Sequence, residues 1–77
     1  MAVTIYTTPT CPYCRSAKRY LQERGVPFRE VDVARDPRAA VELVRKTGQT
    51  GVPVIEVNGE WIIGFDVARL QRALGLR

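Results

Sequence analysis

The sequence predicts an α/β domain whose elements follow the order βαβ–α–ββ–α. Three observations support this fold class. A β-rich run at Val3–Thr7 is followed by a helical pattern and by a second β-rich run near Phe28–Val33. Asp36 and the proline after it are start signals for a second helix. The pair Asn58-Gly59 separates two further β-rich runs, which predicts a hairpin with a type I′ turn.

The composition is that of one small globular domain over residues 1–77, with 45% apolar and 26% charged residues. The net charge of +4 is dispersed along the chain, so we expect no nucleic-acid-binding surface. The N-terminus has no charged leader and no long apolar run. We therefore expect no signal peptide and no membrane-spanning helix. We also expect the protein to be a cytoplasmic monomer.

The first half of the chain predicts a right-handed parallel βαβ unit. A loop of three residues, 8–10, should follow the first strand because its proline resists strand extension. The helix is expected from Pro12 to Arg24, where Gly25 supplies a stop signal. Its apolar residues recur at helical spacing: Cys14, Ala17, Tyr20 and Leu21. In the strand that follows, Val31 and Val33 should lie on one face and Glu30 and Asp32 on the other.

The second half predicts a helix, a hairpin and a last helix. The first of these helices should end at Gly48, and its inward stripe is Ala40, Leu43, Val44 and Thr47. The hairpin strands are Val54–Val57 and Glu60–Ile63. Asp66 should cap the last helix, which ends near Gly75. Its apolar stripe is Val67, Leu70 and Leu74.

The two cysteines of the chain lie in the run Cys11-Pro12-Tyr13-Cys14. Pro12 suits the first position of a helix, where its missing N–H costs nothing. Cys11 is then at or near the N-cap, and Cys14 lies one turn later on the same face. Two sulfurs placed in this way can form a disulfide without displacing the backbone.

The charge at this helix start predicts which cysteine attacks. A helix N-terminus presents unpaired N–H groups and about half a positive charge, which favours a thiolate at Cys11. Arg15 and Lys18 are expected to add positive potential and to tune its pKa. The pKa of a C-x-x-C thiol can fall from about 8.5 to about 3.5–7.5 in such surroundings. Cys11 is therefore interpreted as the attacking thiolate and Cys14, less exposed, as the resolving thiol.

Two other interpretations of the cysteine pair are less favourable. A zinc site needs four ligands, and two cysteines without any histidine cannot supply them, so we expect no metal site. A purely structural disulfide that closes so short a loop would stabilise the fold little. No flavin or nicotinamide motif is present, so we expect no tightly bound cofactor and a reductant that comes from outside.

Four motifs resemble the glutaredoxins, and the resemblance covers the whole chain. They are Tyr6-Thr7, Cys11-Pro12-Tyr13-Cys14, Gly51-Val52-Pro53 and Gly64-Phe65-Asp66. The resemblance implies the thioredoxin fold, a four-stranded mixed sheet flanked by three helices. It also implies a cis peptide bond before Pro53 and a backbone pairing of Val52 with the cysteinyl part of glutathione or a peptide.

The same resemblance implies a surface for glutathione or substrate. Its residues are Thr8, Tyr13, Gln49, Val52, Pro53, Gly64, Phe65 and Asp66. Asp66 is expected to contact the γ-glutamyl amino group and Gln49 to lie near the glycyl end. Many glutaredoxins carry, at the position of Thr8, a lysine that binds the glycyl carboxylate. The chain departs from the family there, and weak glutathione binding is expected.

The predicted function is a dithiol oxidoreductase that reduces protein disulfides or glutathione mixed disulfides, with glutathione as co-substrate. Gly64-Phe65 and Trp61 are also similar to the NrdH-redoxins, which take electrons from thioredoxin reductase, a flavin enzyme. A second alternative is an iron–sulfur carrier that uses Cys11 of two chains and two glutathione thiols; Pro12 and Tyr13 argue against it. A third is an interaction module without chemistry, which the intact cysteine pair disfavours.

Overall fold

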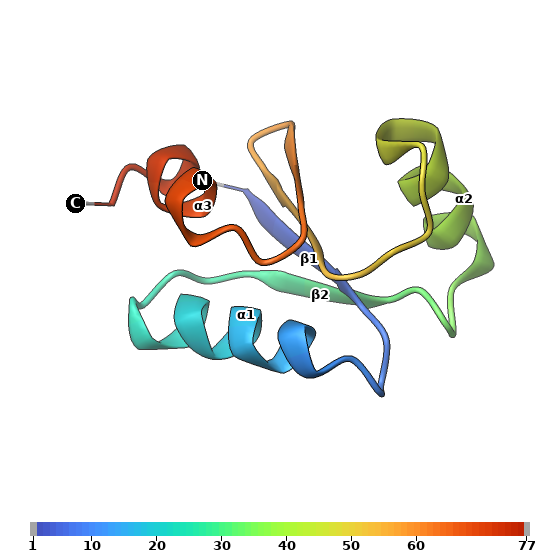
Figure 1. Cartoon of the computed structure of the whole chain (residues 1–77), viewed down its shortest axis with the longest axis horizontal. Helices are drawn as coiled ribbons and strands as arrows, with labels where there is room; N and C mark the ends of the chain where they lie inside the picture. The colour runs from blue at the N-terminus through green and yellow to red at the C-terminus, as the bar shows by residue number, and fades with distance from the viewer. Residues whose placement is uncertain (1, 77) are drawn as a thin grey trace.

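The computed structural model describes residues 2–76, which form one four-stranded sheet and three helices (Figure 1). The elements are β1 (Val3–Thr7), α1 (Pro12–Glu23), β2 (Arg29–Asp32), α2 (Pro37–Thr47), β3 (Val54–Val57), β4 (Glu60–Ile63) and α3 (Val67–Leu74). The predicted order is confirmed. Helix α1 ends one residue before the predicted Arg24, which is its C-cap.

The sheet is mixed, with strand order β2-β1-β3-β4. Strands β1 and β2 run parallel and are joined through α1, as the βαβ prediction requires. Strand β3 pairs antiparallel with both β1 and β4. The turn of the β3–β4 hairpin holds Asn58 at φ 50° and Gly59 at φ 89°. Two consecutive positive φ angles are the requirement of a type I′ turn, so this prediction is also confirmed.

Apolar side chains pack on both faces of the sheet. The larger cluster joins residues of β1, β3 and β4, such as Ile5 and Ile55, to α1 and α3. The smaller cluster joins Tyr6 and Val54 to Leu43 of α2. Because neighbouring residues of a strand point to opposite faces, Ile5 and Tyr6 lie in different clusters. Helices α1 and α3 therefore cover one face, and α2 covers the other.

Two predicted core residues are exposed instead. Val44 is 39% exposed, because α2 is rotated so that Ala39 and Leu43 pack against the sheet. Val67 is 42% exposed, because it is the first residue of α3 and lies beyond the part of the helix that reaches the core. Leu70 is fully buried, so the stripe of α3 holds only from its second turn.

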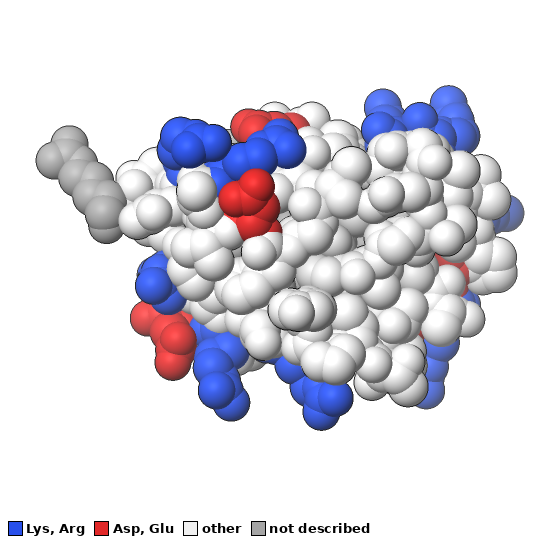
Figure 2. Space-filling model, in the orientation of Figure 1, with Lys and Arg blue, Asp and Glu red and all other residues white. Residues whose placement is uncertain are grey.

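In the view of Figure 2 most charged side chains lie around the rim of the molecule, one group of both signs reaches onto the upper left of the face, and the centre carries none. The basic residues there are not gathered into one patch, in agreement with the dispersed charge of the sequence. Within residues 2–76 there is no helix with the length and apolar character needed to cross a membrane.

Candidate active site

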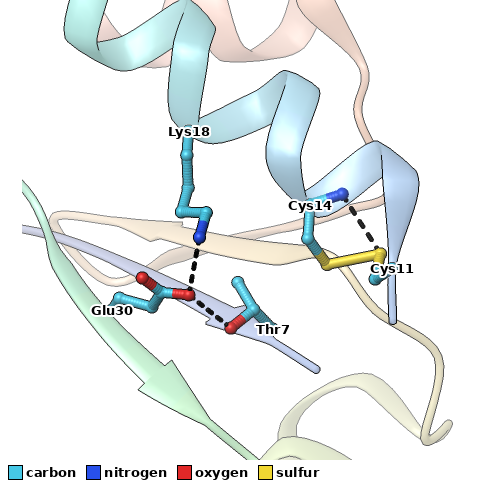
Figure 3. Close-up of a disulfide and its surroundings, with 5 residues drawn as sticks. All are labelled: Thr7, Cys11, Cys14, Lys18 and Glu30. Atoms are coloured by element: carbon cyan, nitrogen blue, oxygen red, sulfur yellow. Dashed lines mark hydrogen bonds and ion pairs between the residues drawn. A yellow bond between two sulfur atoms is a disulfide. The ribbon is translucent and has the colours of Figure 1, made fainter. Parts of the chain in front are cut away.

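The two cysteines form a disulfide at the N-terminus of α1 (Figure 3). Cys11 is the N-cap, with extended backbone angles of φ −94° and ψ 109°, and Pro12 begins the helix. The Cα atoms of Cys11 and Cys14 lie 5.2 Å apart. The backbone N–H of Cys14 donates to Sγ of Cys11 at 3.1 Å. The sulfur of Cys11 therefore occupies the place where a capping residue normally offers an oxygen acceptor.

This geometry gives the two sulfurs different surroundings. The side chain of Cys14 is buried, with 1% exposure, whereas Cys11 is half-buried. That the N–H donor and the positive end of the helix stabilise a thiolate at Cys11 in the reduced protein stays a prediction. Burial disfavours a charged sulfur, so a neutral thiol at Cys14 is the matching prediction. The arrangement suits an attacking Cys11 and a resolving Cys14.

Thr8 takes part in the site through its backbone. The N–H of Cys11 donates to the carbonyl of Thr8 at 3.4 Å, which closes the loop between β1 and α1. The N–H of Arg15 donates to the carbonyl of Cys11 at 3.4 Å, so the first helical turn is formed. The Arg15 side chain is exposed. Its effect on the pKa of Cys11 stays a prediction.

Lys18 is held in an ion pair beside the disulfide (Figure 3). Its Nζ lies 3.0 Å from Oε2 of Glu30 on β2. The hydroxyl of Thr7, at the end of β1, donates to the same oxygen at 2.8 Å. The hydrogen bond from Thr7 and then that from Lys18 lower the pKa of Glu30. The effect of Lys18 on the pKa of Cys11 stays a prediction. The charge of Lys18 is paired with the carboxylate of Glu30.

Sequence reasoning missed Thr7 and Glu30 as members of this site. One signal was present, because the alternation along β2 placed Glu30 on the face opposite Val31. Lys18 lies one turn after Cys14 on α1 and so projects toward the same side of the sheet. These two placements bring a carboxylate and an ammonium together on the side of α1 that faces the sheet.

The peptide bond between Val52 and Pro53 is cis, as the resemblance implied. Pro53 is buried, and Val52 is half-buried against the cluster on the α2 face. The N–H of Gly64 donates to the carbonyl of Pro53 at 2.9 Å. This bond joins the loop before β3 to the end of β4. The structure therefore brings two of the predicted motifs, those of Pro53 and Gly64, into contact.

The remaining predicted site residues have other contacts. The ring of Phe65 packs edge-on against Tyr20 with centroids 5.9 Å apart, so it belongs to the core as well as to the predicted surface. Asp66 caps α3 by accepting the N–H of Arg69 at 3.1 Å, and its side chain is exposed. Gln49 is exposed in the loop after α2. For Gln49, Phe65 and Asp66, contact with a ligand stays a prediction.

Two aromatic residues complete the description. Tyr13 is 68% exposed on the first turn of α1, where it offers an apolar surface next to the disulfide. Trp61 is half-buried and stacks on Tyr6, with ring centroids 5.3 Å apart and an interplanar angle of 22°. Burial raises the pKa of Tyr6, and the nearby carboxylate of Glu56 raises it further. Trp61 thus packs on the sheet, in agreement with its strand position.

Comparison with known proteins identifies the family. The glutaredoxin family model matches residues 3–62. A glutaredoxin of Pseudomonas aeruginosa is 47% identical over 73 residues, which cover 92% of this chain and 86% of that protein. A glutaredoxin-like 8.6 kDa protein in the rubredoxin operon of Clostridium pasteurianum is 39% identical over 94% of this chain and 96% of its own length.

A solved structure extends the likeness to the fold. The NrdH-redoxin of Escherichia coli, described there as a glutaredoxin-like protein with a thioredoxin-like activity profile, superposes with a TM-score of 0.82 at 33% identity. The match covers 94% of this chain and 93% of that one. The four-stranded mixed sheet, the three helices and the Cys11–Cys14 pair agree with a thioredoxin-fold redoxin. The chain belongs to the glutaredoxin family.

Proposed function

We propose that this chain is a dithiol oxidoreductase that reduces protein disulfides or glutathione mixed disulfides. The thiolate of Cys11 attacks one substrate sulfur, and the other substrate sulfur leaves and takes a proton. Cys14 then loses its proton and attacks Sγ of Cys11, which releases the second substrate thiol. The substrate has gained two electrons and two protons, and the chain is left with the Cys11–Cys14 disulfide.

The observation that supports this proposal most strongly is the unequal placement of the two sulfurs. Cys11 caps the helix and accepts the N–H of Cys14 at 3.1 Å, whereas Cys14 is 1% exposed. A thiolate is the nucleophile in disulfide exchange, and a leaving thiol of low pKa departs faster. A stabilised thiolate at Cys11 therefore assists both the first attack and the second step.

We propose glutathione as the co-substrate that restores the dithiol, with no tightly bound cofactor. The Cys-Pro-Tyr-Cys motif, the cis bond before Pro53 and the exposed carboxylate of Asp66 support this choice. Thr8 lacks the charge that would bind the glycyl carboxylate. A hydrogen bond to a charged group contributes about 1.5–3 kcal/mol, so its loss weakens binding about 10- to 140-fold. The protein is proposed to act as a monomer in the cytoplasm.

A second electron donor, thioredoxin reductase, is favoured by a different set of observations. The chain is 33% identical to the NrdH-redoxin of Escherichia coli over nearly its whole length. It shares with that class the Gly64-Phe65 pair and a tryptophan at position 61. Threonine in place of lysine at position 8 fits a protein that does not depend on glutathione.

Two coupled assays separate these donors. The oxidised protein is reduced either by glutathione with glutathione reductase or by thioredoxin reductase, and NADPH consumption is followed in both. We expect turnover with glutathione. Turnover with thioredoxin reductase alone would overturn the glutathione proposal and establish an NrdH-like redoxin, and Thr8→Lys should then begin to restore glutathione dependence.

A further inference from the structure

The hydroxyl of Thr7 has one proton to donate, and in the structure it donates a hydrogen bond to Glu30. Thr7 is 2% exposed at the end of β1, and its Oγ1 donates to Oε2 of Glu30 at 2.8 Å. A hydroxyl can donate only one hydrogen bond, although it can accept two. While the hydroxyl of Thr7 donates to Glu30, it cannot donate to a sulfur of the redox pair.

The same carboxylate also holds Lys18. The ammonium lies 3.0 Å from Oε2 of Glu30, one helical turn beyond Cys14 on the same side of α1. A cation on this side would stabilise a thiolate at Cys14, but its charge is matched by Glu30. In Figure 3 Thr7 and Glu30 lie on the strands, and Lys18 extends from α1 toward Glu30 to one side of the disulfide.

Two further charged residues, Asp32 and Arg15, lie on the same elements as Glu30 and Lys18. Asp32, next along β2, accepts the N–H of Ala34 at 2.9 Å and lies 3.9 Å from the guanidinium of Arg35. Arg15 is exposed on α1.

We propose that Glu30 is a positioning residue that keeps Cys14 protonated until the resolving step. Because Glu30 accepts the hydrogen bond of Thr7 and pairs with the charge of Lys18, neither group stabilises a thiolate at Cys14. This inference rests on the proposed dithiol function. In the reduced protein it gives two cysteines that lie one turn apart opposite protonation states. Cys11 has a backbone donor, whereas Cys14 is buried and the donors of Thr7 and Lys18 on this side of α1 are bound to Glu30. Premature ionisation of Cys14 would let it compete with Cys11 for substrate.

The test uses the Cys11→Ser variant, in which Cys14 is the one remaining thiol and serine still caps α1. Thiolate absorbance at 240 nm is recorded against pH, and its midpoint gives the pKa of Cys14. Glu30→Gln should lower that pKa by about one unit or more, because it removes a negative charge and frees Lys18. Glu30→Met should lower it further, since the Thr7 hydroxyl then also loses its acceptor.

Glu60→Gln is the matched control, because Glu60 is also ion-paired, with Arg69 at 3.3 Å, but at the outer hairpin edge. It should leave the midpoint unchanged. An unchanged or raised pKa in Glu30→Gln would overturn the proposal. Adding Thr7→Val to Glu30→Met should return the midpoint toward that of Glu30→Gln, and no return would overturn the part assigned to Thr7. These titrations need no substrate, so a failure of the proposed reductase activity would appear separately in the coupled assays.

Discussion

Asp66 has two assigned roles that one pair of substitutions can separate. Its Oδ1 accepts the N–H of Arg69 at 3.1 Å and so caps α3, while its exposed carboxylate is the proposed contact for the amino group of glutathione. Asparagine caps a helix about as well as aspartate but carries no charge. Asp66→Asn should therefore leave folding nearly intact and remove only the charged contact. Asp66→Ala should remove both.

The magnitudes follow from the two contacts. Loss of the cap in Asp66→Ala should cost about 1 kcal/mol, which lowers the unfolding temperature of a domain this small by roughly 4–8 °C. Loss of the charge-assisted contact should weaken glutathione binding by about 1.5–3 kcal/mol, or roughly 10- to 140-fold. Asp66→Asn should show the second effect without most of the first. Circular dichroism on heating and the glutathione-coupled assay measure the two separately.

Asp36 provides the matched control. It caps α2 with the same geometry, its Oδ1 accepting the N–H of Ala39 at 3.1 Å, but it has no assigned contact with glutathione. Asp36→Asn loses the same interaction between a negative charge and a helix dipole. Subtracting its effect on activity from that of Asp66→Asn therefore isolates the ligand contact. Full glutathione-linked activity in Asp66→Asn would refute the assignment of Asp66 to the ligand. An equal loss of activity in Asp36→Asn would show that the effect is not local to the site.

Three further results are expected. Alkylation of the reduced protein by iodoacetamide against pH should give a Cys11 midpoint well below about 8.5, and Arg15→Glu should move it upward because a negative charge then faces the thiolate; an unshifted wild-type midpoint would contradict thiolate stabilisation by the helix. Leu43→Ala should lower the free energy of unfolding by about 2–5 kcal/mol in urea titrations, because Leu43 is 1% exposed and is the buried residue of α2. A loss below about 1 kcal/mol would contradict the packing of α2 through Leu43. Phe65→Leu should lower stability through the lost contact with Tyr20, whereas unchanged stability would assign Phe65 to the surface alone.

Local signals predicted the elements and the redox pair well. The turn at Asn58, the caps at Asp36 and Asp66 and the N-cap position of Cys11 all depend on residues within a few positions of one another. Such signals depend only on residues that are close in sequence, and the structure confirms each of them. The two motifs around Pro53 and Gly64, in contrast, were connected only through the resemblance to a family, and the hydrogen bond between them is a tertiary contact.

Two features, the exposure of Val44 and the hydrogen bond from Thr7 to Glu30, did not follow from the sequence, and each has a physical cause. Helical periodicity marks a stripe but not its precise rotation, so Val44 was predicted inward although Ala39 faces the sheet in its place. The bond from Thr7 to Glu30 joins residues 23 positions apart and depends on the parallel register of β1 and β2. Register between parallel strands separated by a helix is set by packing. No local pattern showed that the carboxylate of Glu30 would meet that hydroxyl.

The central claim, that Cys11 attacks and Cys14 resolves, is tested most directly by trapping. Each single-cysteine variant is reduced and mixed with a disulfide-bearing substrate at neutral pH, and the adducts are followed by intact mass and located by peptide mapping. Cys14→Ser should accumulate a mixed disulfide on Cys11, because no resolving thiol remains. Cys11→Ser should form little or no adduct, because Cys14 is buried and its thiol is proposed to stay protonated. Faster adduct formation on Cys14 than on Cys11 would contradict the account.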